Sequence, residues 1–107
     1  MSDALVVLIT APSREVGERI AETLVGEELA ACVNLLAPVR SIYRWDGAIC
    51  RDDEILLIAK TTRARYPALE ARVQAVHPYD TPEIIALPVE RGSAAYLAWL
   101  AGATGKV

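Results

Sequence analysis

Two uninterrupted apolar runs, 4–10 and 55–59, constrain what this chain can fold into more than any other feature. Both consist of aliphatic, often β-branched residues, and neither alternates with polar residues as a half-exposed strand would. Runs of this kind are typical of central strands that are covered on both faces. We therefore predict that both segments are buried central strands.

Two segments between the predicted strands have helical periodicity. Ser13 is placed to cap a helix that should end by Leu29, and a second helix is predicted over 63–76, where Pro67 is tolerable only in the first turn. His77 precedes a proline and should end this helix. The apolar residues recur at three- and four-residue steps: Val16, Ile20 and Leu24, then Tyr66, Leu69, Val73 and Val76.

The remaining segments complete a known pattern of elements. Strands are predicted over 30–36 and 39–45 with a bend at Pro38, and Asp46-Gly47 is a strong hairpin signal before a return strand from Ile49. A last strand over 83–89 and a short helix after Gly92-Ser93 follow. The order β-α-β-β-α-β-α predicts a single domain, 1–107, with the α+β, ferredoxin-like (split βαβ) sandwich fold.

Composition excludes several classes of protein. Eleven basic and fourteen acidic residues give a net charge of -3, which is unsuited to nucleic-acid binding. The run 4–9 is too short to span a membrane, and two separated cysteines favour a reducing, cytoplasmic setting. Hydrophobic residues make up 53% of the chain, a surplus that points to a subunit interface.

The segment 77–83 gathers the chain's only histidine, a phenol and two carboxylates between two prolines. It is the best candidate for binding or catalysis. His77 alone cannot hold a metal ion, and Glu83, Cys32 or a neighbouring subunit would have to contribute. The equal alternative is a purely structural histidine that hydrogen-bonds a backbone carbonyl at the helix end.

The cysteines, Lys60 and the aromatic residues could each serve either packing or function. We expect Cys32 to pack in the core and Cys50 to lie near solvent, so cysteine catalysis is not favoured. Lys60 either extends past the strand end to water or meets an anionic ligand or another subunit. The aromatic pairs Tyr43/Trp45 and Tyr96/Trp99 each share a face and are more typical of packing or interfaces than of ligand platforms.

Several separated blocks together resemble one family, the CutA divalent-cation tolerance proteins. The similarity runs from about residue 5 to 101 and rests on the segments 7–12, 30–34, 41–45, 60–62, 77–83 and 96–100. It implies a ferredoxin-like, PII-like subunit that forms a cytoplasmic homotrimer, with the long hairpin strands of each subunit pairing with a neighbour's sheet. It also implies tolerance of copper and other divalent metals, and no established reaction.

The metal site that the resemblance implies carries over only in part. Copper-binding members use a cysteine in the first strand and two adjacent histidines, where this chain has Ile9, Val76 and His77. Our first hypothesis is a non-enzymatic trimer for divalent metal (copper) tolerance, with His77 and Glu83 as metal contacts. The second is a PII-like sensor that binds a small anionic ligand in subunit clefts formed by Lys60, Trp45, Tyr79, Cys32 and Asn34. A third, an enzyme using His77 with Asp80 or Glu83, has no substrate clue.

Overall fold

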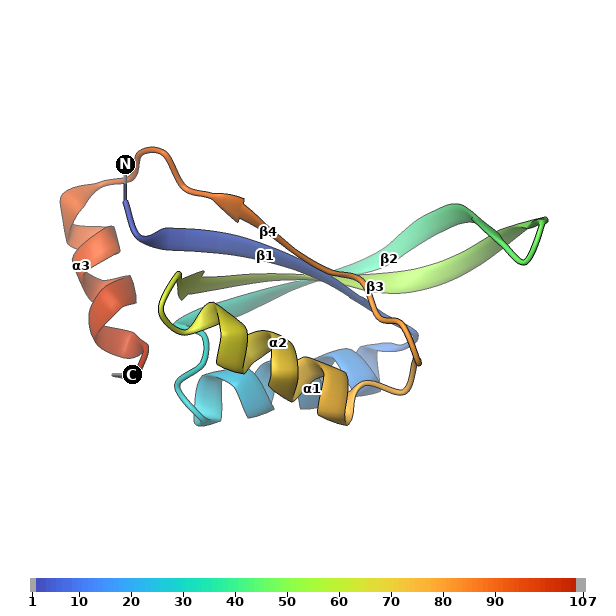
Figure 1. The fold of residues 1–107 in the computed structure, drawn as a ribbon, viewed down its shortest axis with the longest axis horizontal. Helices are drawn as coiled ribbons and strands as arrows, with labels where there is room; N and C mark the ends of the chain where they lie inside the picture. The colour runs from blue at the N-terminus through green and yellow to red at the C-terminus, as the bar shows by residue number, and fades with distance from the viewer. Residues whose placement is uncertain (1, 106–107) are drawn as a thin grey trace.

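The computed structural model describes residues 2–105, and its ribbon is shown in Figure 1. The elements follow the predicted order. They are β1 (Ala4–Ala11), α1 (Arg14–Gly26), β2 (Cys32–Trp45), β3 (Ala48–Thr62), α2 (Tyr66–Val76), β4 (Ile84–Pro88) and α3 (Ala94–Ala103). No helix in residues 2–105 is long and apolar enough to cross a membrane.

The four strands form one antiparallel sheet in the order β2-β3-β1-β4. The two strands predicted from the apolar runs, β1 and β3, are its inner strands. Helices α1 and α2 lie side by side against one face, and α3 packs at the end of the sheet away from the hairpin tip (Figure 1). This is the ferredoxin-like arrangement, so the predicted fold class is confirmed.

Helix α1 begins and ends as the sequence predicts. The Ser13 hydroxyl accepts a hydrogen bond from the amide of Val16 at 3.2 Å. Gly17 lets the helix approach the sheet closely, because a Cβ there would lie 3.3 Å from Leu35 Cδ2. The helix ends at Gly26, within the limit of Leu29 that the sequence predicts, and Glu28 adopts a left-handed φ of 59° that turns the chain toward β2.

Helix α2 starts later than predicted. Residues 63–65 form a turn, in which the Arg65 amide donates to the Thr62 carbonyl at 3.2 Å, and the helix begins at Tyr66 with Pro67 in its first turn.

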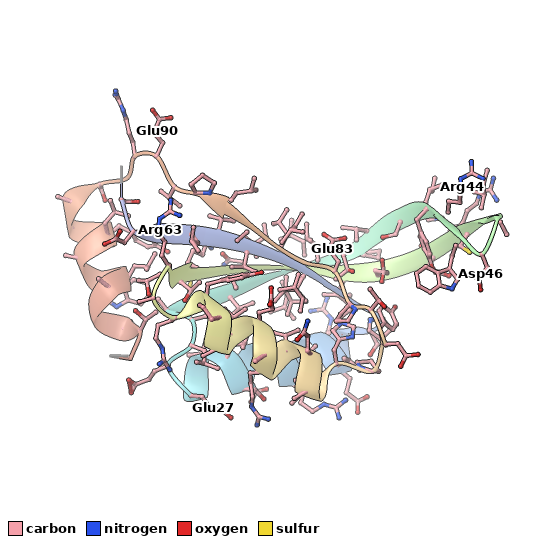
Figure 2. The ribbon with its side chains drawn as sticks, in the orientation of Figure 1. Glu27, Arg44, Asp46, Arg63, Glu83 and Glu90 are labelled. Carbon is pink, nitrogen blue, oxygen red and sulfur yellow. The ribbon has the colours of Figure 1, made fainter. Side chains whose placement is uncertain are left out.

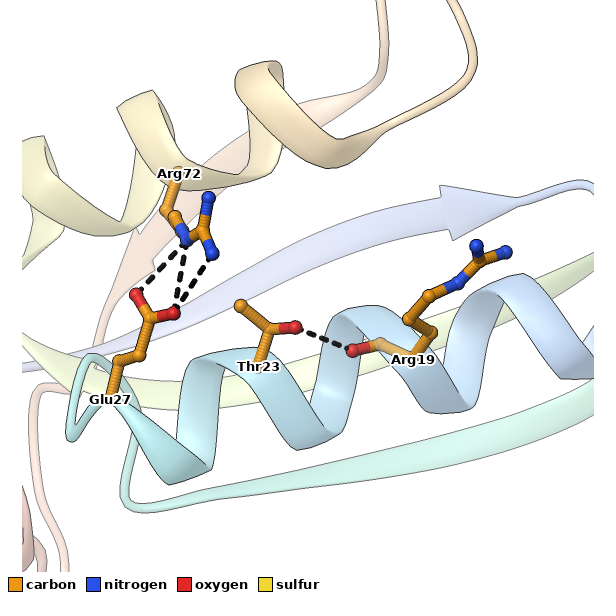
Figure 3. A network of polar contacts seen from close by, with 4 residues as sticks. All are labelled: Arg19, Thr23, Glu27 and Arg72. Carbon is orange, nitrogen blue, oxygen red and sulfur yellow. Dashed lines mark hydrogen bonds and ion pairs between the residues drawn. The ribbon is translucent and has the colours of Figure 1, made fainter.

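Arg72 connects α2 to the end of α1 through hydrogen bonds to both carboxylate oxygens of Glu27, with Nε–Oε1 and Nη2–Oε2 both at 3.0 Å (Figure 3). On α1 itself, the Thr23 hydroxyl donates to the Arg19 carbonyl at 2.8 Å (Figure 3).

The core lies between the sheet and α1 and α2, and the opposite face of the sheet has no comparable cover. In β1 from Leu5 onward, and in β3 from Ile55 onward, buried residues alternate with half-buried ones. Within this chain, the prediction that both faces of these strands are covered is therefore wrong. The apolar runs make both faces of the sheet apolar, and the helices α1 and α2 cover only one of them. We call the other the open face; it carries Val6, Leu8, Leu36, Leu56, Ile58, Ile85 and Leu87.

The far halves of β2 and β3, residues 39–54, form a hairpin arm that extends beyond the helices (Figure 1). Asp46 and Gly47 turn its tip with positive φ values of 51° and 78°. At the base of the arm, the pairing shifts register between Leu36 and Val39, so the bend predicted at Pro38 is confirmed. Ile42, Trp45 and Ile49 on the arm are each more than half exposed. The arm therefore presents apolar area that this chain does not cover.

A groove at the base of the hairpin arm

A groove of about 580 Å³ lies where the loop 77–83 meets the base of the arm, and we call it the arm-base groove. Its size is in the range typical of small-molecule sites. It brings together the loop and both strands of the arm. The lining residues are Thr10, Ser41, Ile42, Tyr43, Trp45, Glu54, Tyr79, Asp80, Thr81 and Glu83.

His77 joins the end of α2 to the end of β1 beneath this groove. Its Nε2 lies 2.8 Å from the Thr10 carbonyl, which can only accept, so Nε2 carries the proton and donates. The other nitrogen, Nδ1, accepts from the Tyr79 amide at 3.1 Å. The side chain is buried, with 7% of its surface exposed. The carbonyl-bonded histidine, one of the two alternatives from the sequence, is confirmed as the geometry of this chain.

Tyr79 connects the histidine loop to β3. Its hydroxyl donates to Glu54 Oε2 at 3.0 Å, and its ring packs against the His77 imidazole with centroids 4.7 Å apart. Burial, followed by the hydrogen bond to Glu54, raises the pKa of Tyr79 to about 12. Glu54 is only 7% exposed although it follows two exposed aspartates in the sequence. The sequence does not predict a role for Glu54 in the site, because an acidic run such as 52–54 is typical of residues exposed to solvent.

The groove is acidic and partly aromatic. Glu54, Asp80 and Glu83 contribute carboxylates, and no lysine or arginine is among its lining residues. Trp45 and Tyr43 lie two residues apart on one face of β2. Tyr43 donates to Asp52, and this hydrogen bond, with smaller contributions from burial and nearby charge, raises the pKa of Tyr43 to about 12. Such a surface suits a positively charged or hydroxyl-bearing group.

The other predicted cleft residues lie in a second cluster, on the open face near α3. Lys60 is paired across the strands with Cys32, and its ammonium donates to the side-chain oxygen of Asn34. Cys32 Sγ lies 3.6 Å from Tyr96 Oη, a contact that raises the pKa of the Tyr96 phenol. Cys32 is half-buried and outside the core clusters, so its predicted core packing is wrong. Cys50, predicted near solvent, is also half-buried.

Within one chain, the structure does not bring the five predicted cleft residues together. Trp45 and Tyr79 line the arm-base groove, whereas Lys60, Cys32 and Asn34 do not. Cys32 and Trp45 are the two ends of the 14-residue strand β2, roughly 40 Å apart at ~3.3 Å per residue. A single cleft that contained all five would need residues from two subunits. An anionic ligand in the arm-base groove would likewise need a basic residue from another subunit.

The two predicted metal contacts occupy different positions. Glu83 is exposed where the loop enters β4, as Figure 2 shows, while both nitrogens of His77 are engaged. No group of three or more histidine, cysteine, aspartate or glutamate residues suited to a metal ion occurs within residues 2–105. Ile9, which stands where the resemblance places a cysteine, is fully buried in the core. Metal binding by His77 and Glu83 stays a prediction.

Comparison with known proteins agrees with the fold. A sequence model of the CutA1 divalent ion tolerance protein family matches residues 5–103. The chain is 54% identical over 100 residues to the divalent-cation tolerance protein CutA of Thermus thermophilus, covering 94% of this chain and 97% of that protein. It is 46% identical over 101 residues to the chloroplastic protein CutA of Arabidopsis thaliana, covering 94% of this chain and 56% of that protein.

Solved structures agree with the same assignment. A divalent cation tolerance protein from Thermus thermophilus superposes with a TM-score of 0.94 at 53% identity, covering 95% of this chain and 99% of that chain. CutA1 from Oryza sativa gives a TM-score of 0.96 at 42% identity, covering 99% and 97%. Sequence and fold therefore agree along nearly the whole chain, and the protein belongs to the CutA1 divalent ion tolerance family.

Proposed function

We propose that this chain acts in divalent-cation tolerance as a cytoplasmic, non-enzymatic homotrimer, with ions bound at the 77–83 loop. The observation that carries the proposal is the position of Glu83 and Asp80, exposed carboxylates on a loop that His77 holds against β1. The family relatives are named for divalent-cation tolerance, which supports the ion class. Copper is the ion that the resemblance implies.

Assembly follows from what one chain leaves uncovered. Ile85 and Leu87 on the open face are each 51% exposed, and Ile49 on the arm is 56% exposed. Apolar area of this extent is typical of a subunit interface. A trimer would also complete the ion site, because this chain alone offers two exposed carboxylates there and a divalent ion takes more ligands than two.

The carboxylate oxygens on the 77–83 loop favour hard divalent ions over copper(I). Carboxylate oxygens suit magnesium, calcium and manganese, and the thiolate that selects soft ions is absent where Ile9 stands. Copper therefore belongs to the proposal as one of several ions and not as a uniquely preferred one. His77 would contribute directly only if Nδ1 released the Tyr79 amide.

Titration calorimetry with manganese(II), zinc(II) and copper(II) chlorides tests the proposal. Glu83→Gln should weaken binding by about tenfold or more, because it removes a charged ligand. Glu90→Gln is the matched control, since Glu90 is also exposed and lies beyond the other end of β4 (Figure 2). Equal affinity of the wild type and Glu83→Gln for every ion would overturn the proposed site.

A further inference from the structure

The buried carboxylate of Glu54 has no cation beside it among the residues that the structure describes. Only 7% of its surface is exposed, and within residues 2–105 no lysine, arginine or histidine lies within ion-pair distance of it. Fully buried acidic residues are almost always paired, because taking a charge out of water is unfavourable without compensation. A phenol on one oxygen compensates only part of this penalty.

One of the two carboxylate oxygens of Glu54 has no hydrogen bond within the described residues. Oε2 accepts from Tyr79, whereas Oε1 has no hydrogen-bond partner in the described part of the chain. Glu54 lines the groove, and Oε1 is not among the fully enclosed, unsatisfied atoms. A group that enters the groove can therefore reach this oxygen.

The walls of the groove indicate what kind of cation fits. The Tyr79 hydroxyl bonds the Glu54 carboxylate, so its ring lies beside that carboxylate, and Trp45, which is 57% exposed, also lines the groove. Guanidinium and alkylammonium groups bind carboxylates and stack on aromatic rings. Ile42 adds apolar surface for an alkyl tail.

We propose that the arm-base groove binds a small organic cation, whose guanidinium or ammonium group pairs with Glu54 while its apolar part lies along Tyr79 and Trp45. A bare metal ion fits this part of the groove less well, because the described residues provide no cluster of three ligands. The contact at Glu54 requires no metal, although Asp80 and Glu83, the proposed ion contacts, line the same groove.

Calorimetry with EDTA-washed protein tests this proposal, with butylguanidinium chloride as the probe. Butylurea, which has the same shape without the charge, should give no binding. Glu54→Gln should weaken butylguanidinium binding by about tenfold or more, since it keeps an acceptor for Tyr79 but removes the charge. Asp53→Asn is the matched control, because it removes the same charge one residue away, at a side chain that pairs with Arg40.

Two further variations make the outcome decisive. Methylguanidinium should bind more weakly than butylguanidinium, because its tail is too short to cover the apolar wall. Circular dichroism of Glu54→Gln should match the wild type, which shows that lost binding is not lost folding. The proposal is overturned if the wild type fails to bind butylguanidinium, or if Glu54→Gln binds it as the wild type does. It is also overturned if Glu54→Gln changes the sedimentation coefficient and leaves butylguanidinium binding unchanged. The cation that pairs with Glu54 then comes from another copy of the chain.

Discussion

His77 Nε2 donates to the carbonyl oxygen of Thr10 at 2.8 Å and so connects two residues that are 67 positions apart in the chain. The same imidazole accepts from the Tyr79 amide through Nδ1. One buried side chain therefore fixes the end of α2, the end of β1 and the start of the loop that lines the arm-base groove. The position of that loop depends on His77 whether or not an ion binds to it.

His77→Ala should lower the free energy of unfolding by about 2–4 kcal/mol, because it removes two hydrogen bonds and the buried imidazole that makes them. Urea denaturation at a fixed protomer concentration measures this, since the stability of an oligomer depends on concentration. Gln74→Ala, an exposed change on the same helix, should stay within about 0.5 kcal/mol. A His77→Ala value as small as the control would contradict the structural role.

Tyr79→Phe should lower the free energy of unfolding by about 1–3 kcal/mol, because Glu54 would keep its burial and lose its hydrogen bond. Tyr66→Phe is a matched control: its hydroxyl donates to Glu70 at 2.8 Å, but Glu70 is only half-buried and can bond water instead. The control should lose less than about 1 kcal/mol. Equal losses in the two variants would show that the burial of Glu54 has no energetic consequence.

Alkaline pH should destabilise the protein between about 10 and 12. The pKa values of Tyr66 and Tyr79 are raised to about 12, chiefly by burial, from an ordinary value of 10.0. A phenol whose pKa is higher in the folded state gives stability that is fully present below pH 10 and is lost as pH rises toward 12. Phenolate absorbance should show one fewer late-titrating group in Tyr79→Phe, and an unchanged titration curve would refute the assignment.

The sequence predicts the core of this fold well and its outer surfaces less well. The apolar runs 4–10 and 55–59 identify the inner strands because a buried strand must be continuously apolar, and Asp46-Gly47 identifies the hairpin because few residues accept positive φ. The same runs cannot reveal which molecule covers each face. The end of α1 at Gly26 depends on the left-handed turn at Glu28, for which glutamate is not a typical residue.

The site was predictable only where the residue types themselves are unusual. His77, Tyr79 and Glu83 stand out in a short proline-bounded loop, and Trp45 stands out as an exposed aromatic residue near a hairpin. Glu54 has no such signal, because its burial depends on strand register and on a tyrosine 25 residues away. The contact between Lys60 and Asn34 is diagonal across two strands and likewise depends on register.

Leu87→Glu should weaken the proposed trimer, because it places a charge on the open face, where we expect another subunit to pack. Val25→Glu is the matched control: Val25 is 44% exposed, but it lies on α1, away from the open face. Size-exclusion chromatography with light scattering should show smaller species for Leu87→Glu at micromolar concentration and no change for Val25→Glu. The same mass for both variants would remove the open face from the interface.

Sedimentation equilibrium of the wild-type chain measures its assembly state. We expect a single species near three times the chain mass of 11.6 kDa, stable on dilution to low micromolar concentration, because the open face and the arm are apolar and uncovered in one chain. A folded species of 11.6 kDa, with the circular dichroism of the concentrated sample, would contradict both the proposed assembly and the shared ion site that depends on it.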